Sequence, residues 1–192
     1  MPLVSRHSRW CTAFAIAAAF AAGSSALRAQ APPAQAPAAP ATLQGDLLKD
    51  WEALKDTMMK IGDAMPPDKF GYKPTPEQRS FGEQLMHIAT SNIGLMKVID
   101  AKATAPTVND KATAKADILK ALGDSYDFGI AVLKAQTAAS VTETVTGPRF
   151  LGPSTRARIA YRAMGHAWDE YGVMTTYLRL NGIVPPASRG AM

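Results

Sequence analysis

The chain has 192 residues, among them 21 Lys or Arg, 16 Asp or Glu and a single cysteine, Cys11. Cys11 lies in an apolar N-terminal stretch that we expect to be removed, so the mature chain has no thiol. This excludes thiol nucleophiles, disulfides and thiolate zinc sites. The same stretch holds three of the basic residues and no acidic one, which leaves 18 basic against 16 acidic residues and no run of Lys or Arg. Such a balance predicts neither a nucleic-acid partner nor binding to an acidic membrane surface.

Residues 1–29 have the three parts of an export signal. Arg6 and Arg9 form a short positive region, and residues 11–23 (CTAFAIAAAFAAG) are apolar but short for a bilayer span. A small-residue cleavage site precedes Gln30. We therefore predict a signal peptide and a periplasmic or secreted protein, with no stable membrane insertion after the signal is removed. The alternative is that the segment remains as an N-terminal membrane anchor.

The next segment, residues 30–41 (QAPPAQAPAAPA), contains only Gln, Ala and Pro. Such a composition cannot bury a core, so we predict an extended, flexible linker. The remaining residues, 42–192, are enough chain for one domain, and they contain no internal repeat.

Four amphipathic helices are predicted in this domain. The first spans 43–64, where apolar residues recur at steps of three and four, and two prolines follow its end. The second begins at Ser80, which forms a capping-box pattern with Glu83. The third spans roughly 110–138.

A β-prone stretch, residues 140–153, follows the third helix and is either a loop or a short hairpin. The last helix is predicted to start after Ser154 as its N-cap and to run to Leu180, where Asn181 and Gly182 give a stop signal. Four such helices without a convincing series of strands predict an all-α fold, most simply a helical bundle.

The apolar stripe of the last helix contains two residues that break its pattern. His166 and Glu170 are four positions apart, so they lie on the same face, one turn from each other, where the core is expected. A buried carboxylate is costly unless it is paired, hydrogen-bonded or bound to a metal. The spacing fits a metal site, and it also fits a simple His–Glu hydrogen bond or a stripe at the open end of the bundle.

His87, in the second helix, shares a sector with Gly94 and Val98, to one side of the apolar stripe. This sector either faces a neighbouring helix, with the glycine giving room, or leaves the histidine half-exposed. Together with His166 and Glu170 it would supply two imidazoles and one carboxylate, a ligand set for Zn, Ni, Mn or Fe(II). A ferritin-like di-iron site fits poorly because paired Glu-x-x-His motifs are absent from the sequence.

Three segments resemble the DinB-like family: residues 73–81 (KPTPEQRSF), 82–89 (GEQLMHIA) and 166–188 (HAWDEYGVMTTYLRLNGIVPPAS). The resemblance covers essentially residues 43–188, and YLRLNGIVPP is a specific part of it. It implies a four-helix bundle with up-down-down-up connectivity, and the metal site that the related bacillithiol and mycothiol enzymes share with this fold.

Many members of that family have three histidines, one on the second helix and an H-x-x-x-H pair on the last. The first two positions fall on His87 and His166, whereas the third holds Glu170. The resemblance thus implies a His2Glu site for a divalent transition metal, and with it transferase or hydrolase activity on a small molecule that the sequence does not identify. The alternative is a non-catalytic helical binding or structural module with a degenerate metal site. A homodimer is compatible with such a bundle.

Overall fold

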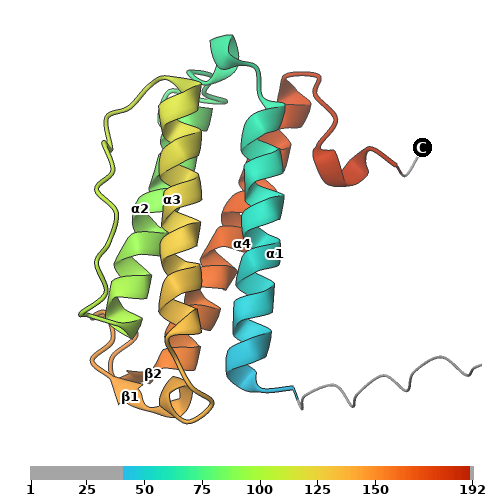
Figure 1. The fold of residues 1–192 in the computed structure, drawn as a ribbon. Coiled ribbons are helices and arrows are strands. Elements are labelled where there is room, and N and C mark those ends of the chain that lie inside the picture. The colour runs from blue at the N-terminus through green and yellow to red at the C-terminus, as the bar shows by residue number, and fades with distance from the viewer. Residues whose placement is uncertain (1–40, 191–192) are drawn as a thin grey trace, which may run out of the picture. The chain divides into compact units, whose positions relative to one another are not determined.

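Four long helices account for most of residues 41–190, the part of the chain that the computed structural model describes (Figure 1). They are α1 (Leu43–Ala64), α2 (Phe81–Ile99), α3 (Lys115–Lys134) and α4 (Arg156–Leu180). The short elements are two strands, β1 (Thr144–Val145) and β2 (Ser154–Thr155), and the 3-10 turns Pro67–Lys69, Ser140–Thr142 and Pro186–Ser188. None of the helices in residues 41–190 combines the length and apolar character needed to span a membrane. The predicted signal peptide and linker, up to residue 40, lie outside the described residues.

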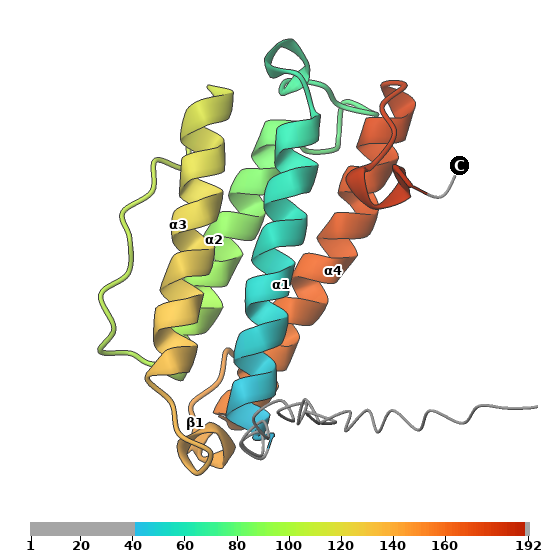
Figure 2. The same cartoon turned by 45° about the vertical axis from the view of Figure 1, so that its right-hand side comes forward.

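The helices form a bundle with up-down-down-up connectivity (Figures 1 and 2). A long connection between α2 and α3 runs back along the bundle, so both helices start at the same end and run in the same direction. α2 packs mainly against α3 and α4, and α1 packs mainly against the same two helices. The predicted all-α four-helix bundle is confirmed, and this packing makes α2 and α4 neighbours.

The predicted limits of the first helix are confirmed, because local signals set both of its ends. The Thr42 side chain accepts a hydrogen bond from the backbone N–H of Gly45 and caps α1. Met65 is extended ahead of two prolines, as the residue before a proline prefers, and the helix ends there.

The capping box predicted at the start of α2 is also formed. The hydroxyl of Ser80 accepts from the backbone N–H of Glu83, and the Glu83 carboxylate accepts from the backbone N–H of Ser80. Lys73 lies 3.2 Å from the same carboxylate. Glu83 is therefore engaged in capping, as the sequence predicted, although it lies one turn before His87.

Trp51 is the largest fully buried side chain of the core. Its Nε1–H donates to the carbonyl oxygen of Tyr126 at 3.0 Å, and the two rings pack with centroids 5.0 Å apart. Its indole also lies against Gly129, at a place where a Cβ atom would overlap the ring. The close approach of α1 and α3 therefore depends on a glycine in the middle of α3.

The third helix is shorter than predicted at both ends, so the prediction of roughly 110–138 was wrong there. Before α3, the Asn109 side chain accepts from the backbone N–H of Lys111 and forms a local turn in place of a helical one. After α3, Thr137 and Ser140 exchange hydrogen bonds between their side-chain oxygens and backbone N–H groups. Side chains that bond to nearby backbone compete with the helix, and a periodicity argument does not include that competition.

The predicted N-cap of the last helix was wrong by one residue. Thr155, and not Ser154, accepts from the backbone N–H of Arg158 and caps α4. Ser154 instead pairs with Val145 in the antiparallel ladder of β1 and β2. The hairpin alternative for the stretch after α3 is thus confirmed in a minimal, two-residue form. At the other end, α4 stops as predicted, with Gly182 at a φ of 73°.

Candidate metal site

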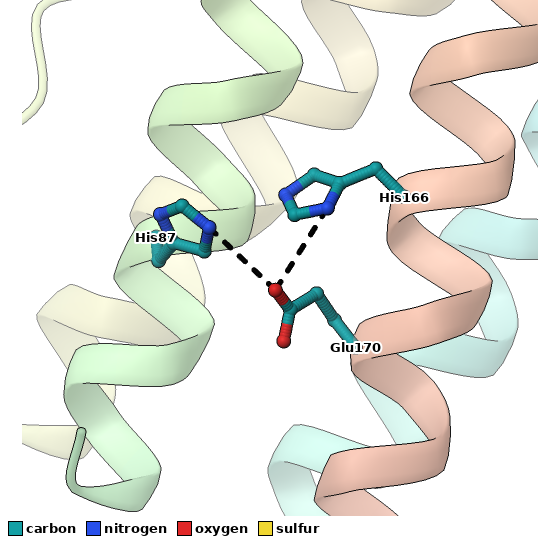
Figure 3. Close-up of side chains that lie close together, drawn as sticks. All are labelled: His87, His166 and Glu170. Carbon is teal, nitrogen blue, oxygen red and sulfur yellow. Dashed lines mark ion pairs between the residues drawn. The ribbon is translucent and has the colours of Figure 1, made fainter. Parts of the chain in front are cut away.

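The packing of α2 against α4 brings His87, His166 and Glu170 together (Figure 3). His87 Nε2 lies 3.5 Å from Glu170 Oε1, and His166 Nδ1 lies 3.8 Å from the same oxygen. One donor atom from each of the three residues lies within 4.8 Å of the others. The predicted convergence is therefore confirmed. Within residues 41–190, this is the only place where three or more His, Asp or Glu side chains lie close enough together to hold one metal ion.

The three side chains differ in how far they are exposed. Glu170 is buried, with a side-chain exposure of 8%, whereas the side chains of His166 and His87 are 19% and 30% exposed. The cluster is therefore closed on the side of the carboxylate and open to solvent on the side of the imidazoles. Such an arrangement gives small molecules access to the imidazoles while the carboxylate remains shielded from water.

Gln84 fixes the orientation of the buried carboxylate. Its side-chain amide donates a hydrogen bond to Glu170 Oε2, and Gln84 is itself buried. Because one oxygen is held in this way, the other, Oε1, faces His87 and His166 (Figure 3). Sequence reasoning missed Gln84. The available signal was a polar residue three positions before His87, on the same side of the helix.

The distances between the imidazoles and Glu170 Oε1 exceed those of ordinary N–H···O hydrogen bonds, which are about 2.7–3.2 Å. Among the described residues, no hydrogen bond reaches Oε1. The geometry therefore does not show the simple His–Glu hydrogen bond that the sequence left open. Two ligands of a tetrahedral ion with bonds of about 2.0–2.1 Å are about 3.3–3.4 Å apart. One donor atom of each residue lies within 4.8 Å of the others, and the set combines two imidazoles with a carboxylate, so the residues fit a divalent transition metal.

Burial and nearby arginines set the protonation of the cluster. Burial lowers the pKa of His87 and of His166, and the positive charges of Arg79 and Arg162 lower them further. Burial raises the pKa of Glu170, and this rise is opposed by the charges of His87 and Arg79. These effects favour the neutral form of both imidazoles, which is the form that binds a metal.

Arg79 belongs to the loop before α2, and Tyr177 of α4 fixes this loop. The Tyr177 hydroxyl donates to the carbonyl oxygen of Arg79 at 2.9 Å, and its ring packs against Tyr72 and Phe81. This contact ties the start of α2 to α4, and it thereby also fixes the relation between His87 and the residues of α4. Tyr177 is buried, and its contact with Arg79 could not be read from the sequence.

Two hollows in the surface border the cluster, one beside each histidine. The hollow beside His87 has a volume of about 550 Å³ and is lined mainly by charged and polar side chains, including Lys73, Glu77 and Arg79. The hollow beside His166 has a volume of about 320 Å³. A small molecule can thus approach the imidazoles from either side.

Comparison with known proteins agrees with this architecture. The family model of the DinB superfamily matches residues 50–174, a range that includes all three residues of the cluster. Among solved structures, a DinB-like protein of Bacillus cereus is 19% identical, with a TM-score of 0.65, and the match covers 76% of this chain and 96% of that one. A DinB-like protein of Bacillus subtilis is 18% identical, with a TM-score of 0.58, covering 71% and 92%. At these low sequence identities, the similarity shows that the fold is shared and says nothing about activity. No curated protein matches the chain.

Proposed function

The chain belongs to the DinB superfamily, and from the geometry of its cluster we propose that it binds one divalent transition metal ion through His87, His166 and Glu170. The observation that carries this proposal is the buried Glu170. One of its oxygens is held by Gln84, and the other faces two imidazole nitrogens at distances too long for hydrogen bonds. A buried carboxylate in this state is stabilised by a cation that shares it with the imidazoles.

The donor set limits the identity of the metal. Two imidazoles and one carboxylate, without thiolate, suit Zn, Ni, Mn or Fe(II). Three protein ligands leave coordination positions open, as in catalytic sites. A divalent ion held there supplies Lewis acidity for a transferase or hydrolase reaction.

The chain's own residues prepare this site for chemistry. Gln84 holds the carboxylate, and the lowered pKa values of both histidines favour the unprotonated imidazoles. Tyr177 anchors the loop that carries Arg79, whose positive charge lies close enough to both imidazoles to lower their pKa values. A substrate would thus meet a preformed site with a positive group at its margin.

We further propose that the protein acts in the periplasm or outside the cell, on a small molecule and not on nucleic acid. The positive and apolar segments of residues 1–29 and the nearly balanced charge of the remainder support this proposal. Because low-molecular-weight thiols are cytosolic reagents, export favours hydrolysis, or a transfer that needs no thiol cofactor.

A metal titration of the purified chain tests the proposal. After removal of metals, the protein is titrated with Zn²⁺, Ni²⁺, Mn²⁺ and Fe²⁺, and the bound metal is measured by elemental analysis. We expect about one equivalent of at least one metal, and an affinity at least about tenfold weaker in Glu170→Gln and His166→Ala. Asp50→Asn is the matched control, since it removes an exposed carboxylate of α1, away from the cluster, and should leave the affinity unchanged.

Binding of less than about a tenth of an equivalent of all four metals would overturn the proposal. So would full binding by the His166→Ala variant. Either result would favour the alternative of a non-catalytic module with a degenerate site, in which His166→Ala leaves function unchanged.

A further inference from the structure

The hollow beside His166 differs in chemistry from the hollow beside His87. Its walls include the apolar side chains Leu95, Pro148 and Phe150, together with Arg162 and His166. The hollow beside His87 is lined instead by charged residues of both signs. An apolar group would therefore lose more contact with water in the hollow beside His166.

Phe150 is the most informative part of this wall. It lies in the connection between β1 and β2, and the residue is 69% exposed although its side chain is large and apolar. Covering exposed apolar surface is favourable at about 25 cal/mol per Å². A ligand with an apolar body would supply such a cover, since Leu95 and Pro148 line the same hollow.

Arg162 adds a positive charge to this apolar wall. Its guanidinium lies over the Phe150 ring, 6.0 Å from the centroid, which is within the range of a cation–π contact. It also lies close enough to His166 to lower the pKa of that imidazole. Arg162 forms no ion pair with any carboxylate in the described part of the chain. The guanidinium is thus available to a negative group on a ligand, and its planar fork suits a carboxylate in particular.

Gly94 supplies the room in this hollow. A Cβ atom placed at Gly94 would meet no heavy atom within 4 Å, and Gly94 lines the hollow. The absence of a side chain at Gly94 is therefore not needed for a close contact between helices. A larger side chain at this position would occupy the hollow without colliding with the rest of the fold.

We propose that the hollow beside His166 binds a small organic carboxylate with an apolar alkyl or aryl body. The apolar body contacts Leu95 and Phe150, the carboxylate pairs with Arg162, and the other end of the molecule reaches His166. That this ligand is the substrate rests on the proposed metal function, because His166 belongs to the metal cluster. The binding site itself rests only on the residues of the hollow.

Phenylbutyrate, an aryl carboxylate, serves as the probe, and its neutral analogue phenylbutanol serves as the matched ligand. Binding of each to the full chain is measured by calorimetry, and metal content is measured on the same samples. We expect Gly94→Leu to weaken phenylbutyrate binding at least about tenfold, and Phe150→Ala to weaken it several-fold. Gly172→Leu is the control, because Gly172 is a second exposed helical glycine with open space at its Cβ and lies outside the hollow.

Arg162→Gln should weaken phenylbutyrate binding about tenfold and leave phenylbutanol binding unchanged. The inference would be overturned if phenylbutyrate did not bind, if Gly94→Leu and Phe150→Ala bound it like the unmodified chain, or if phenylbutanol bound equally well. If the metal-loaded chain does not bind phenylbutyrate, the proposed ligand site is contradicted, whereas the proposed metal function is not affected. Binding that depends on Gly94, in a chain that takes up none of the four metals on titration, supports the proposed ligand site and contradicts the metal function.

Discussion

Glu170 is the residue on which the site depends, and its environment explains why. Alone in the core, a carboxylate would be expelled or neutralised, and burial does raise its pKa. Gln84 compensates one oxygen by a hydrogen bond, and two imidazoles face the other. The metal affinity should therefore depend on a residue that is not itself a ligand.

Replacing Gln84 tests this dependence. In Gln84→Leu the carboxylate loses the donor that orients it, so we expect the metal affinity to fall by about 10- to 100-fold. Gln136→Leu is a suitable control, since Gln136 is a partly buried glutamine that bonds only locally, after α3. Equal affinities in the two variants, measured by competition with a chromophoric chelator, would show that Gln84 has no part in the site.

The pH dependence of metal binding follows from the histidines. Protons compete with the metal for both imidazoles, and burial lowers their pKa values from the ordinary 6.5. The affinity should therefore fall on acidification at a lower pH than it would with two imidazoles of ordinary pKa. Protonation of Glu170 adds to the loss at still lower pH, although burial raises its pKa above the ordinary 4.5. A half-loss of affinity at or above about pH 7, where two imidazoles of ordinary pKa would produce it, would contradict this description when measured in titrations at constant ionic strength.

At the residue scale, the sequence was sufficient to place His166 and Glu170 on one face, because a four-residue spacing in a helix fixes their relation. His87 was harder to place, since its sector lies beside the apolar stripe of its helix. Only the histidine pattern of the family indicated that His87 lies next to His166 and Glu170. Gln84 could not have been assigned without the structure, because its role depends on which residue of α4 lies opposite.

At the scale of elements, the ends of α1 and the start of α2 were predictable because prolines and a capping box mark them. The ends of α3 were not. The limits of α3 are set by side-chain hydrogen bonds to nearby backbone groups. The polar residues that form these bonds do not interrupt the apolar periodicity, so the pattern extends past the real ends of the helix. The N-cap of α4 is Thr155 and not the predicted Ser154, because Ser154 pairs with Val145 in the strand ladder.

Two glycines of α3 give opposite predictions for the same substitution. Gly129→Ala should lower the free energy of unfolding by about 1–3 kcal/mol, because the new methyl group overlaps the Trp51 indole. Gly123→Ala should raise it by up to about 1 kcal/mol, because its methyl group meets Met59 only at ordinary contact distance, and alanine favours the helix. Urea unfolding measures both. An equal effect of the two substitutions would show that Trp51 does not pack closely on α3.

At the scale of the whole molecule, the connectivity creates the site. The long connection after α2 lets α3 run parallel to it, and α4 then returns beside α2 (Figure 1). His87 of α2 faces His166 and Glu170 of α4 across this contact (Figure 3). Amphipathic patterns predicted four helices but not their order in space, which came from the family resemblance. Function belongs to the side chains at this one interface and not to the bundle as such.

The most direct test of the central claim is X-ray absorption spectroscopy of the metal-loaded chain. The proposed site predicts nitrogen and oxygen neighbours only, with outer-shell scattering from two imidazoles and metal–nitrogen bonds of about 2.0–2.1 Å if the metal is zinc. One imidazole should disappear in His87→Ala or in His166→Ala. A spectrum without imidazole scattering, or one that neither substitution changes, would contradict the proposed site.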